Sequence, residues 1–141
     1  MENKYSVSNH FGVYGTVTDN GKILCIHKNA GPYKNRYDLP GGSQENWEGL
    51  TETLSREFVE ETGYTIKKYS NPRVYDTFVR EKGNLNVVHH IMVFYDVELD
   101  NNIEKQDLPS CFLDGFNDSD GIARVPFENF NEANSSPLLI N

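Results

Sequence analysis

The sequence predicts an α/β fold with a mixed central β-sheet. Several strand-like stretches come first, then one long helix-like stretch, more strand-like stretches and a short helix-like one, an order that favours this class. The run Leu85–Val97 has a continuous apolar middle, as expected of a central strand that is buried on both faces. No repeat, low-complexity tract or interdomain linker interrupts the 141 residues, so we expect one domain spanning residues 1–141.

The part of the chain before the long helix is expected to form a hairpin and a loop. Residues 1 to about 9 are polar and are expected to be loosely held. Asn20-Gly21 is a strong signal for a two-residue hairpin turn. The segment of residues 29–36 contains a Gly and a Pro and is expected to be a loop. Strands are expected over residues 11–18, 22–28 and 37–39.

One long helix is expected over Gly49–Thr62. This segment is rich in Leu, Glu and Thr and has no internal Pro, and Gly63 lies where a helix stop is expected. Leu50, Leu54 and Phe58 recur at a spacing of four, which is the apolar stripe of a helix that packs on a core.

The chain returns to strands after this helix. The turn Lys82-Gly83-Asn84 separates two of them, and a short helix is expected from Pro126 to Phe130. The expected strands cover residues 64–68, 73–80, 85–97 and 122–125.

Three carboxylates crowd the second half of the long helix. Glu57, Glu60 and Glu61 are three and four positions apart, so they project from one side. Like charges at this spacing destabilise a helix by about 0.2–0.5 kcal/mol per pair, and the helix dipole disfavours anions near the C-terminus. These terms indicate a missing cation, and carboxylate oxygens suit Mg²⁺, Mn²⁺ or Ca²⁺. The alternative is a solvated acidic face, the more frequent meaning of a charge run.

The spacing around these carboxylates resembles the Nudix box. That pattern is a Gly, five residues, a Glu, seven residues, Arg-Glu, an apolar residue, any residue, Glu-Glu, any residue, a Gly and an apolar residue. The segment of residues 42–64 fills every specified position. The nine matching residues are Gly42, Glu48, Arg56, Glu57, Phe58, Glu60, Glu61, Gly63 and Tyr64. The resemblance covers this segment, and it implies a Nudix-type α/β/α sandwich.

The resemblance also implies the ligands of a metal centre. Glu57, Glu60 and Glu61 would ligate divalent cations, with Glu57 nearest to the role of general base. The backbone carbonyl of Gly41 would be a further ligand. The implied cofactor is Mg²⁺ or Mn²⁺.

Other box residues are implied to position these ligands. Arg56 and Glu48 would form an ion pair that orients the carboxylates and ties the loop to the helix. Glu52, four residues before Arg56, is an alternative partner for the guanidinium. Gly42 would let the loop turn tightly, and Gly63 would cap the helix.

Outside the box the sequence gives weaker indications. Asp118 and Asp120 are candidates for the further acidic ligand or base that many members of the family place outside the box. The alternative is a solvated turn, since Asp, Asn, Ser and Gly are common turn formers. Lys28 and Arg36 flank the loop before the box and are candidate phosphate-binding residues; plain surface charge is the alternative.

Histidine and tryptophan residues add two expectations. His89 and His90 are adjacent on an expected strand, so they should face opposite sides of the sheet. Trp47, in the box loop, is expected to cover the helix as a lid rather than to contact a substrate.

Composition excludes several classes of partner. The formal net charge is −8, whereas a nucleic-acid polymer or a membrane surface calls for a basic face. No run approaches transmembrane length and no signal peptide is visible, so we expect a cytoplasmic protein. Cys25 and Cys111 form neither a disulfide framework nor a zinc site, and Cys25 is expected to be a small core hydrophobe.

Together these patterns predict an enzyme of phosphate chemistry. The resemblance implies a metal-dependent pyrophosphohydrolase that cleaves a nucleoside diphosphate linked to another group, nucleoside triphosphates included, by attack of water on phosphorus. A homodimer, common among relatives, stays open. One alternative is a non-catalytic nucleotide-sensing or interaction module on the same fold, and another is an acidic Ca²⁺-buffering surface.

Overall fold

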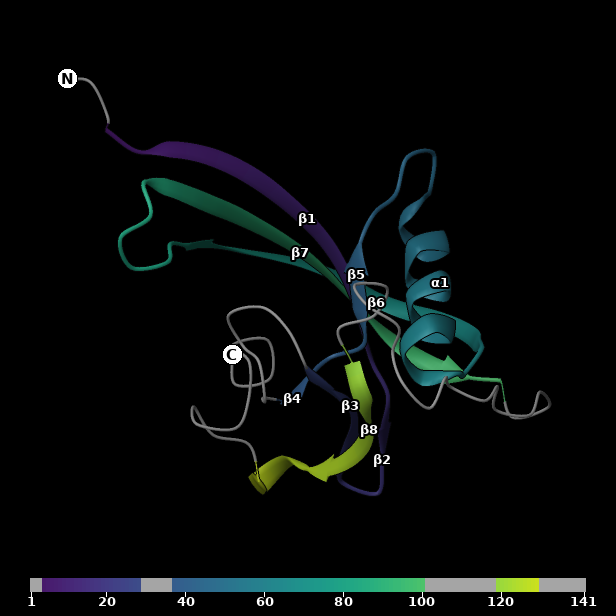
Figure 1. Cartoon of the computed structure of the whole chain (residues 1–141). Helices are drawn as coiled ribbons and strands as arrows, with labels where there is room; N and C mark the ends of the chain where they lie inside the picture. Colours follow the sequence, from purple (N-terminus) through teal and green to yellow (C-terminus); the bar gives the residue numbers. More distant parts are fainter. Residues whose placement is uncertain (1–3, 29–36, 101–118, 130–141) are drawn as a thin grey trace.

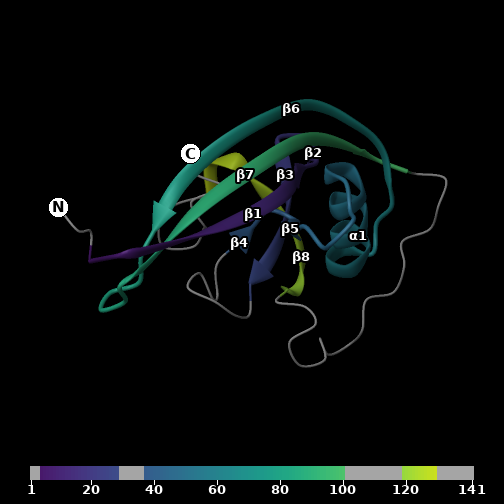
Figure 2. The same ribbon diagram turned by 90° about the horizontal axis from the view of Figure 1, so that it is seen from above.

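The computed structural model describes residues 4–28, 37–100 and 119–129, and in these ranges it contains two β-sheets and one α-helix that packs on one side of the first sheet (Figures 1 and 2). The elements are β1 (Ser6–Thr16), β2 (Thr18–Asp19), β3 (Lys22–Lys28), β4 (Tyr37–Asp38), β5 (Gly41–Ser43), α1 (Leu50–Thr62), β6 (Ile66–Val79), β7 (Asn86–Leu99), β8 (Ser119–Pro126) and the 3₁₀ turn η1 (Phe127–Asn129).

The first sheet is mixed, as the sequence predicts. Its strand order is β5-β1-β7-β6. β1 and β7 run parallel, with Ser6 opposite Asn86 at one end and Thr16 opposite Asp96 at the other. The β1–β5 and β6–β7 pairs are antiparallel. The second sheet has the order β2-β3-β4, and β8 pairs with β3.

The middle parts of the two central strands of the first sheet are buried on both faces. On one side Val13 and Val93 pack against Leu54 and Phe58 of α1. On the other side Tyr14 of β1 and Phe94 of β7 pack against residues of the second sheet, among them Cys25. The apolar middle of β7 is therefore buried on both faces, as its sequence indicates.

Two local predictions are confirmed by backbone geometry. Asn20 and Gly21 both have positive φ, at 52° and 76°, which is the requirement of a type I′ hairpin turn. Gly63 ends α1 in the left-handed conformation with φ 76°, and its N–H donates to the carbonyls of Phe58 and Val59. Cys25 is fully buried, and this burial together with the charge of Asp38 raises the pKa of its thiol to about 12.

Two expectations about element limits are wrong. Residues 6–9 are part of β1 rather than a loose terminus, because pairing with β7 supplies backbone hydrogen bonds that polarity alone does not reveal. The two strands expected over residues 64–80 are one strand, β6, which absorbs its polar stretch as a bulge between Ser70 and Arg73, with Asn71 at φ 51°. The short helix expected after Pro126 is confirmed as the 3₁₀ helix η1.

Among the residues that the structure describes, no helix is both long and apolar enough to cross a membrane.

Candidate active site

β5 brings the loop glycines against the helix. Gly41 has φ +145°, and a Cβ there would lie 2.1 Å from the backbone oxygen of Val13. A Cβ on Gly42 would lie 2.6 Å from the carboxyl carbon of Glu57. A side chain at position 41 would overlap backbone atoms, so only glycine lets the strand approach β1 this closely. A side chain at position 42 would instead displace the carboxylate at the flexible end of Glu57.

Arg56 pairs with Glu48 in a bidentate geometry. The guanidinium Nε donates to Glu48 Oε2 at 2.7 Å, and Nη2 donates to Oε1 at 3.0 Å. These hydrogen bonds from Arg56, helped by the backbone N–H of Glu45 and the hydroxyl of Thr53, lower the pKa of the Glu48 carboxyl to about 2. The same bonds, with those to Glu57, raise the pKa of the Arg56 guanidinium above its usual range. Arg56 is therefore a permanent cation in the loop–helix junction.

The other side of the guanidinium meets the helix carboxylates. Nη1 donates to Glu57 Oε1 at 2.9 Å and lies 3.3 Å from Glu60 Oε2. Nη2 also donates to the backbone carbonyl of Ser43 at 3.0 Å. One arginine therefore holds β5, the loop and two turns of α1 in a fixed relation.

Glu61 and Glu52 have different partners. Glu61 is only 3% exposed, and its Oε1 accepts a 2.8 Å hydrogen bond from the backbone N–H of Gly41. Glu52 accepts from the backbone N–H of Gly49 at the start of the helix. Glu48, not Glu52, is thus the carboxylate that pairs with Arg56.

The loop between β5 and α1 is cross-linked through the same carboxylate. Glu48 Oε1 accepts from the backbone N–H of Glu45 at 2.9 Å and from the hydroxyl of Thr53 at 3.1 Å. Trp47 in this loop has φ 68° and a fully exposed side chain. Trp47 therefore does not cover the helix, and the expectation of a lid is wrong: the left-handed backbone turns its ring outward.

The donor set suits a hard cation without forming a ready-made cage. Every side-chain donor is a carboxylate, and oxygen ligands are those that Mg²⁺ and Mn²⁺ prefer. In the part of the chain that is described, no three His, Cys, Asp or Glu side chains converge on one point as a metal site. Glu57 and Glu60 converge instead on Arg56 Nη1. The cation that the sequence predicts to be missing is therefore supplied in part by this guanidinium.

The structure describes only some of the candidate residues outside the box. Asp118 and Arg36 lie outside the described residues. The backbones of Lys28 and Asp120 lie in β3 and β8, where Lys28 is opposite Ser119. These two candidates thus lie near the adjacent ends of two paired strands of the second sheet.

A cluster of ring and hydroxyl groups on the other face of the sheet was not anticipated from the sequence. His90 contacts the Tyr14 hydroxyl at 3.2 Å, and the rings of His90 and His10 lie 4.6 Å apart. His10 also hydrogen-bonds the hydroxyl of Ser43, the residue whose carbonyl accepts from Arg56. His89 faces the opposite side, as predicted from its position beside His90. Only the parallel register of β1 and β7 brings His10 to His90, and no local sequence signal reveals that register.

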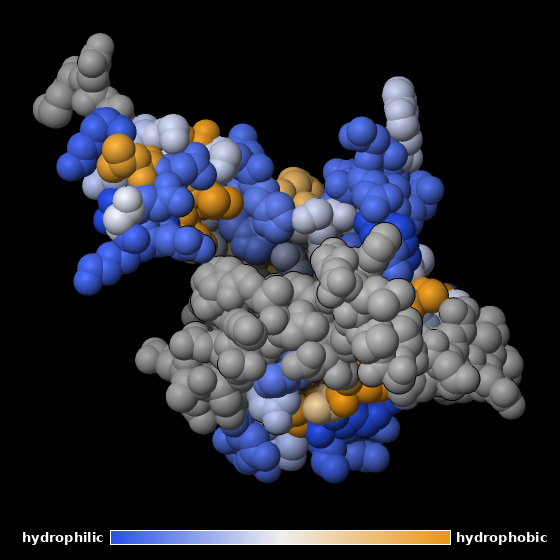
Figure 3. Space-filling view, viewed as in Figure 1, coloured by the Kyte–Doolittle hydropathy of each residue, from blue (hydrophilic) through white to orange (hydrophobic). Residues whose placement is uncertain are grey.

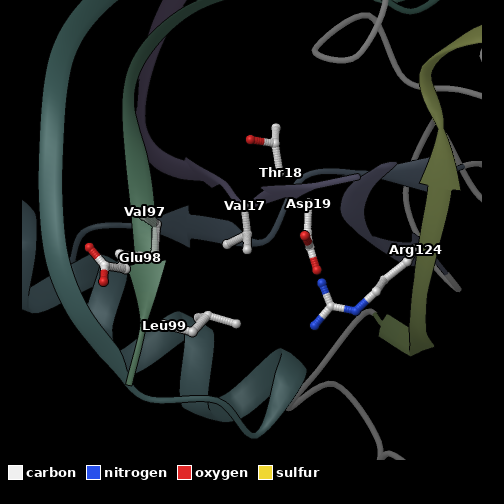
Figure 4. A pocket seen from close by; sticks show the side chains of 7 residues that line it. All are labelled: Val17, Thr18, Asp19, Val97, Glu98, Leu99 and Arg124. Carbon is white, nitrogen blue, oxygen red and sulfur yellow. The ribbon is translucent and has the colours of Figure 1, made fainter. Parts of the chain in front are cut away.

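A separate cavity of about 220 Å³ lies between the two sheets and contains none of the predicted site residues (Figure 4). In it the carboxylate of Asp19 and the guanidinium of Arg124 point toward one another. The lining residues are Val17, Thr18, Asp19, Val97, Glu98, Leu99 and Arg124.

Fold and site together define an α/β protein with an arginine-ordered carboxylate cluster at a glycine loop. Comparison with known proteins identifies the family to which a protein of this class belongs. The family model of the NUDIX domain matches residues 8–137. The chain therefore belongs to the Nudix family, and the resemblance predicted from the box is confirmed.

Individual relatives agree with this assignment. The chain is 38% identical over 65 residues to an ADP-ribose pyrophosphatase of Methanocaldococcus jannaschii. That match spans 46% of this chain and 38% of the relative's length. The crystal structure of a MutT NUDIX hydrolase from Burkholderia pseudomallei superimposes with a TM-score of 0.73 at 17% identity, covering 94% of this chain and 95% of that one. A NUDIX hydrolase from Nitrosomonas europaea gives a TM-score of 0.63 at 16% identity, covering 94% and 84%. At this identity the structures show that the fold is shared.

Proposed function

We propose that this chain is a divalent-metal-dependent pyrophosphohydrolase. It would cleave the pyrophosphate bond of a nucleoside diphosphate linked to another moiety, or of a nucleoside triphosphate, by attack of water on phosphorus. One observation carries the proposal: Arg56 gathers the carboxylates of Glu48, Glu57 and Glu60 while Glu61 binds the backbone of Gly41. Carboxylates held at a glycine loop are suited to dications and the phosphate oxygens that dications bind.

Nudix hydrolases generally use divalent metals, and the residues present fit such an ion. Glu57, Glu60 and Glu61 with the carbonyl of Gly41 would hold Mg²⁺ or Mn²⁺. When bound, the metal neutralises phosphate oxygens and lowers the pKa of a bound water. Candidates for a further acidic ligand are Asp118 and Asp120; candidates for phosphate contacts are Lys28 and Arg36.

The chain's own residues set the geometry for this chemistry. Glu57 lies against Gly42 and is fixed by Arg56, so its carboxylate is held in place to accept a proton from the attacking water. Glu60 is the more exposed of the Arg56-bound pair, so it can exchange its arginine contact for a cation with little desolvation cost. Glu61 is buried and fixes the loop backbone to the helix.

The substrate is proposed only at the level of class. A nucleotide derivative such as ADP-ribose is the first to test, because the curated relative is named an ADP-ribose pyrophosphatase. We also propose that residues 1–141 act as one domain and that no nucleic-acid polymer or membrane takes part.

The test is a panel of nucleoside triphosphates, nucleotide sugars, dinucleoside polyphosphates and ADP-ribose with Mg²⁺ or Mn²⁺. Glu57→Gln and Glu60→Gln are expected to stay folded and to lose most turnover, by about 100-fold or more. The matched control is Glu52→Gln, which alters a carboxylate on the same helix that does not contact Arg56, and it should keep most activity. Phosphate release by both site variants at the wild-type rate would refute these assignments.

A non-catalytic nucleotide-sensing module is the second candidate. It is favoured by the guanidinium that already bridges Glu57 and Glu60. In that case no member of the panel is hydrolysed, whereas calorimetry detects nucleotide binding that Glu60→Gln leaves unchanged.

A further inference from the structure

The strand β5 carries part of the proposed metal centre although few neighbours support it. It is three residues long and lies at the edge of the first sheet, where it pairs with β1. The surface is hollowed between the projecting ends of β1 and β7 and the loop that precedes α1 (Figure 3). No strand among the described residues therefore supports the outer edge of β5. Contacts made by its individual residues must fix its position.

The helix holds β5 at two points. Arg56 Nη2 donates to the carbonyl of Ser43 at 3.0 Å, and Glu61 Oε1 accepts from the N–H of Gly41 at 2.8 Å. The same arginine binds Glu57 through Nη1. The position of β5 therefore sets the place of the Gly41 carbonyl and also that of the guanidinium that orders the carboxylates.

A third point of attachment lies on the face of β5 that is turned away from α1. Because a side chain at Gly42 would point to the Glu57 carboxylate, the side chain of the next residue, Ser43, points to the other face. Its hydroxyl is hydrogen-bonded to His10 Nε2 at 2.5 Å, and His10 is its one side-chain partner in the part of the chain that the structure describes. Ser43 is thus held by its hydroxyl from one face and by its carbonyl from the helix.

His10 is itself held by a network that reaches the core. Its ring lies 4.6 Å from that of His90, the residue opposite it in the parallel pair of β1 and β7. His90 Nε2 lies 3.2 Å from the hydroxyl of Tyr14, a core residue that is 7% exposed. Gly12 leaves room for this contact, because a Cβ there would lie 2.6 Å from the Tyr14 hydroxyl oxygen. His10 is therefore a fixed point to which an edge strand can be attached.

We propose that His10 is a positioning residue of the metal centre. Through the Ser43 hydroxyl it fixes β5, so that the Gly41 carbonyl and Arg56 keep the geometry in which a divalent cation is bound. This role rests on the proposed function, because it uses the metal centre assigned there. Loss of a group that orients metal ligands typically weakens metal binding by 10–100-fold, and since His10 acts through Ser43 we expect about 10-fold.

Binding of Mn²⁺ alone to the full chain, measured by electron paramagnetic resonance of the free ion, tests this role without a substrate. His10→Ala and Ser43→Ala should each weaken binding by about 10-fold, since Ser43→Ala removes the hydroxyl and keeps the carbonyl that Arg56 uses. The double variant should bind no more weakly than either, because both changes remove the same bond. The matched control is Ser8→Ala, which removes a hydroxyl that Asn86 contacts two residues away on the same face of β1, and it should bind like the wild type.

A conservative variant separates positioning from a general loss of stability. The amide of Gln reaches the position of the imidazole Nε2, which is the atom that bonds Ser43, whereas the amide of Asn reaches only that of Nδ1. His10→Gln should therefore restore most of the Mn²⁺ affinity and His10→Asn should not. Their melting temperatures without metal should agree, because both replace the same ring by an amide.

The proposal is overturned if His10→Ala binds Mn²⁺ as tightly as Ser8→Ala, or if the wild type binds no Mn²⁺. It is also overturned if the loss in the double variant is the product of the two single losses, or if His10→Asn restores affinity as well as His10→Gln. If no substrate of the panel is hydrolysed but His10→Ala still weakens Mn²⁺ binding, the proposed hydrolysis fails and the role of His10 stands.

Discussion

Removal of the Glu48 carboxylate by Glu48→Ala tests the central claim about the site, that the loop is held to α1 through Arg56. The substitution deletes the bidentate pair with Arg56 and the acceptor used by the Glu45 N–H and the Thr53 hydroxyl. The guanidinium keeps its bonds to Glu57, Glu60 and the Ser43 carbonyl. The loop should therefore loosen while the helix stays folded.

The expected cost follows from the exposure of the pair. The side chain of Arg56 is 23% exposed and that of Glu48 is 16% exposed, so water can replace part of the lost interaction. A hydrogen bond to a charged group contributes about 1.5–3 kcal/mol, and loss of one partner of a fully buried pair costs about 3–5 kcal/mol. Since Arg56 keeps other partners, we expect a loss of about 2 kcal/mol. For a chain near 150 residues this lowers Tm by roughly 4–8 °C.

Thermal and urea unfolding followed by circular dichroism measure this loss, and a double-mutant cycle with Arg56→Ala isolates the pair. The coupling energy should be about 1–3 kcal/mol. Turnover on the best substrate of the panel should fall by about 10–100-fold, as for other residues that orient ligands. The control is Glu52→Ala, which removes the acceptor for Gly49 N–H. A coupling energy near zero, or a larger loss of turnover in the control, would refute the reasoning.

Three further predictions concern the same junction. The pKa of Glu48 is lowered from 4.5 to about 2, chiefly by the hydrogen bonds from Arg56; its contribution to stability is therefore fully present above about pH 4.5 and is lost as the pH falls toward 2. Urea unfolding at pH 7 and pH 3 should show a smaller drop for Glu48→Gln than for the wild type, and an equal drop contradicts the assignment. Gly41→Ala should destabilise the fold by several kcal/mol, because its Cβ would overlap the backbone of β1 and its φ is +145°. Gly42→Ala should instead displace the Glu57 carboxylate, 2.6 Å from the new Cβ; activity assays and melting curves compared for the two variants separate these effects.

Local chemistry allowed much of the site to be predicted from the sequence. The helix limits follow from Gly63 and from the apolar stripe, both of which act within a few residues. The contact of Arg56 with Glu60 is an ordinary i,i+4 pair of a helix, although the partners expected from the sequence were Glu48 and Glu52. The pair with Glu48 lies eight residues away, and it was expected from the resemblance to the box rather than from helix geometry.

What the sequence did not reveal depends on pairing between distant strands. Residues 6–9 look like a polar terminus, yet they are held in β1 by β7, about 80 residues later. The same register brings His10 to His90 and exposes Phe78 on a face continuous with that of Val93. A one-residue change of register would turn each of these side chains to the other face, so no local pattern could have placed them.

The structure also changes what the crowded carboxylates mean. From the sequence, three like charges on one side of a helix imply mutual repulsion, and neutralising one of them should stabilise the metal-free protein. In the structure Glu57 and Glu60 each contact Arg56, whereas Glu61 is buried and accepts a hydrogen bond from the Gly41 N–H. Neutralising Glu57 or Glu60 therefore removes an attraction as well as a repulsion, so the two effects oppose each other and no gain in stability is expected. The helix tolerates its three carboxylates because Arg56 contacts two of them and the Gly41 N–H donates to the third, and only Glu60 is exposed enough to exchange its partner readily.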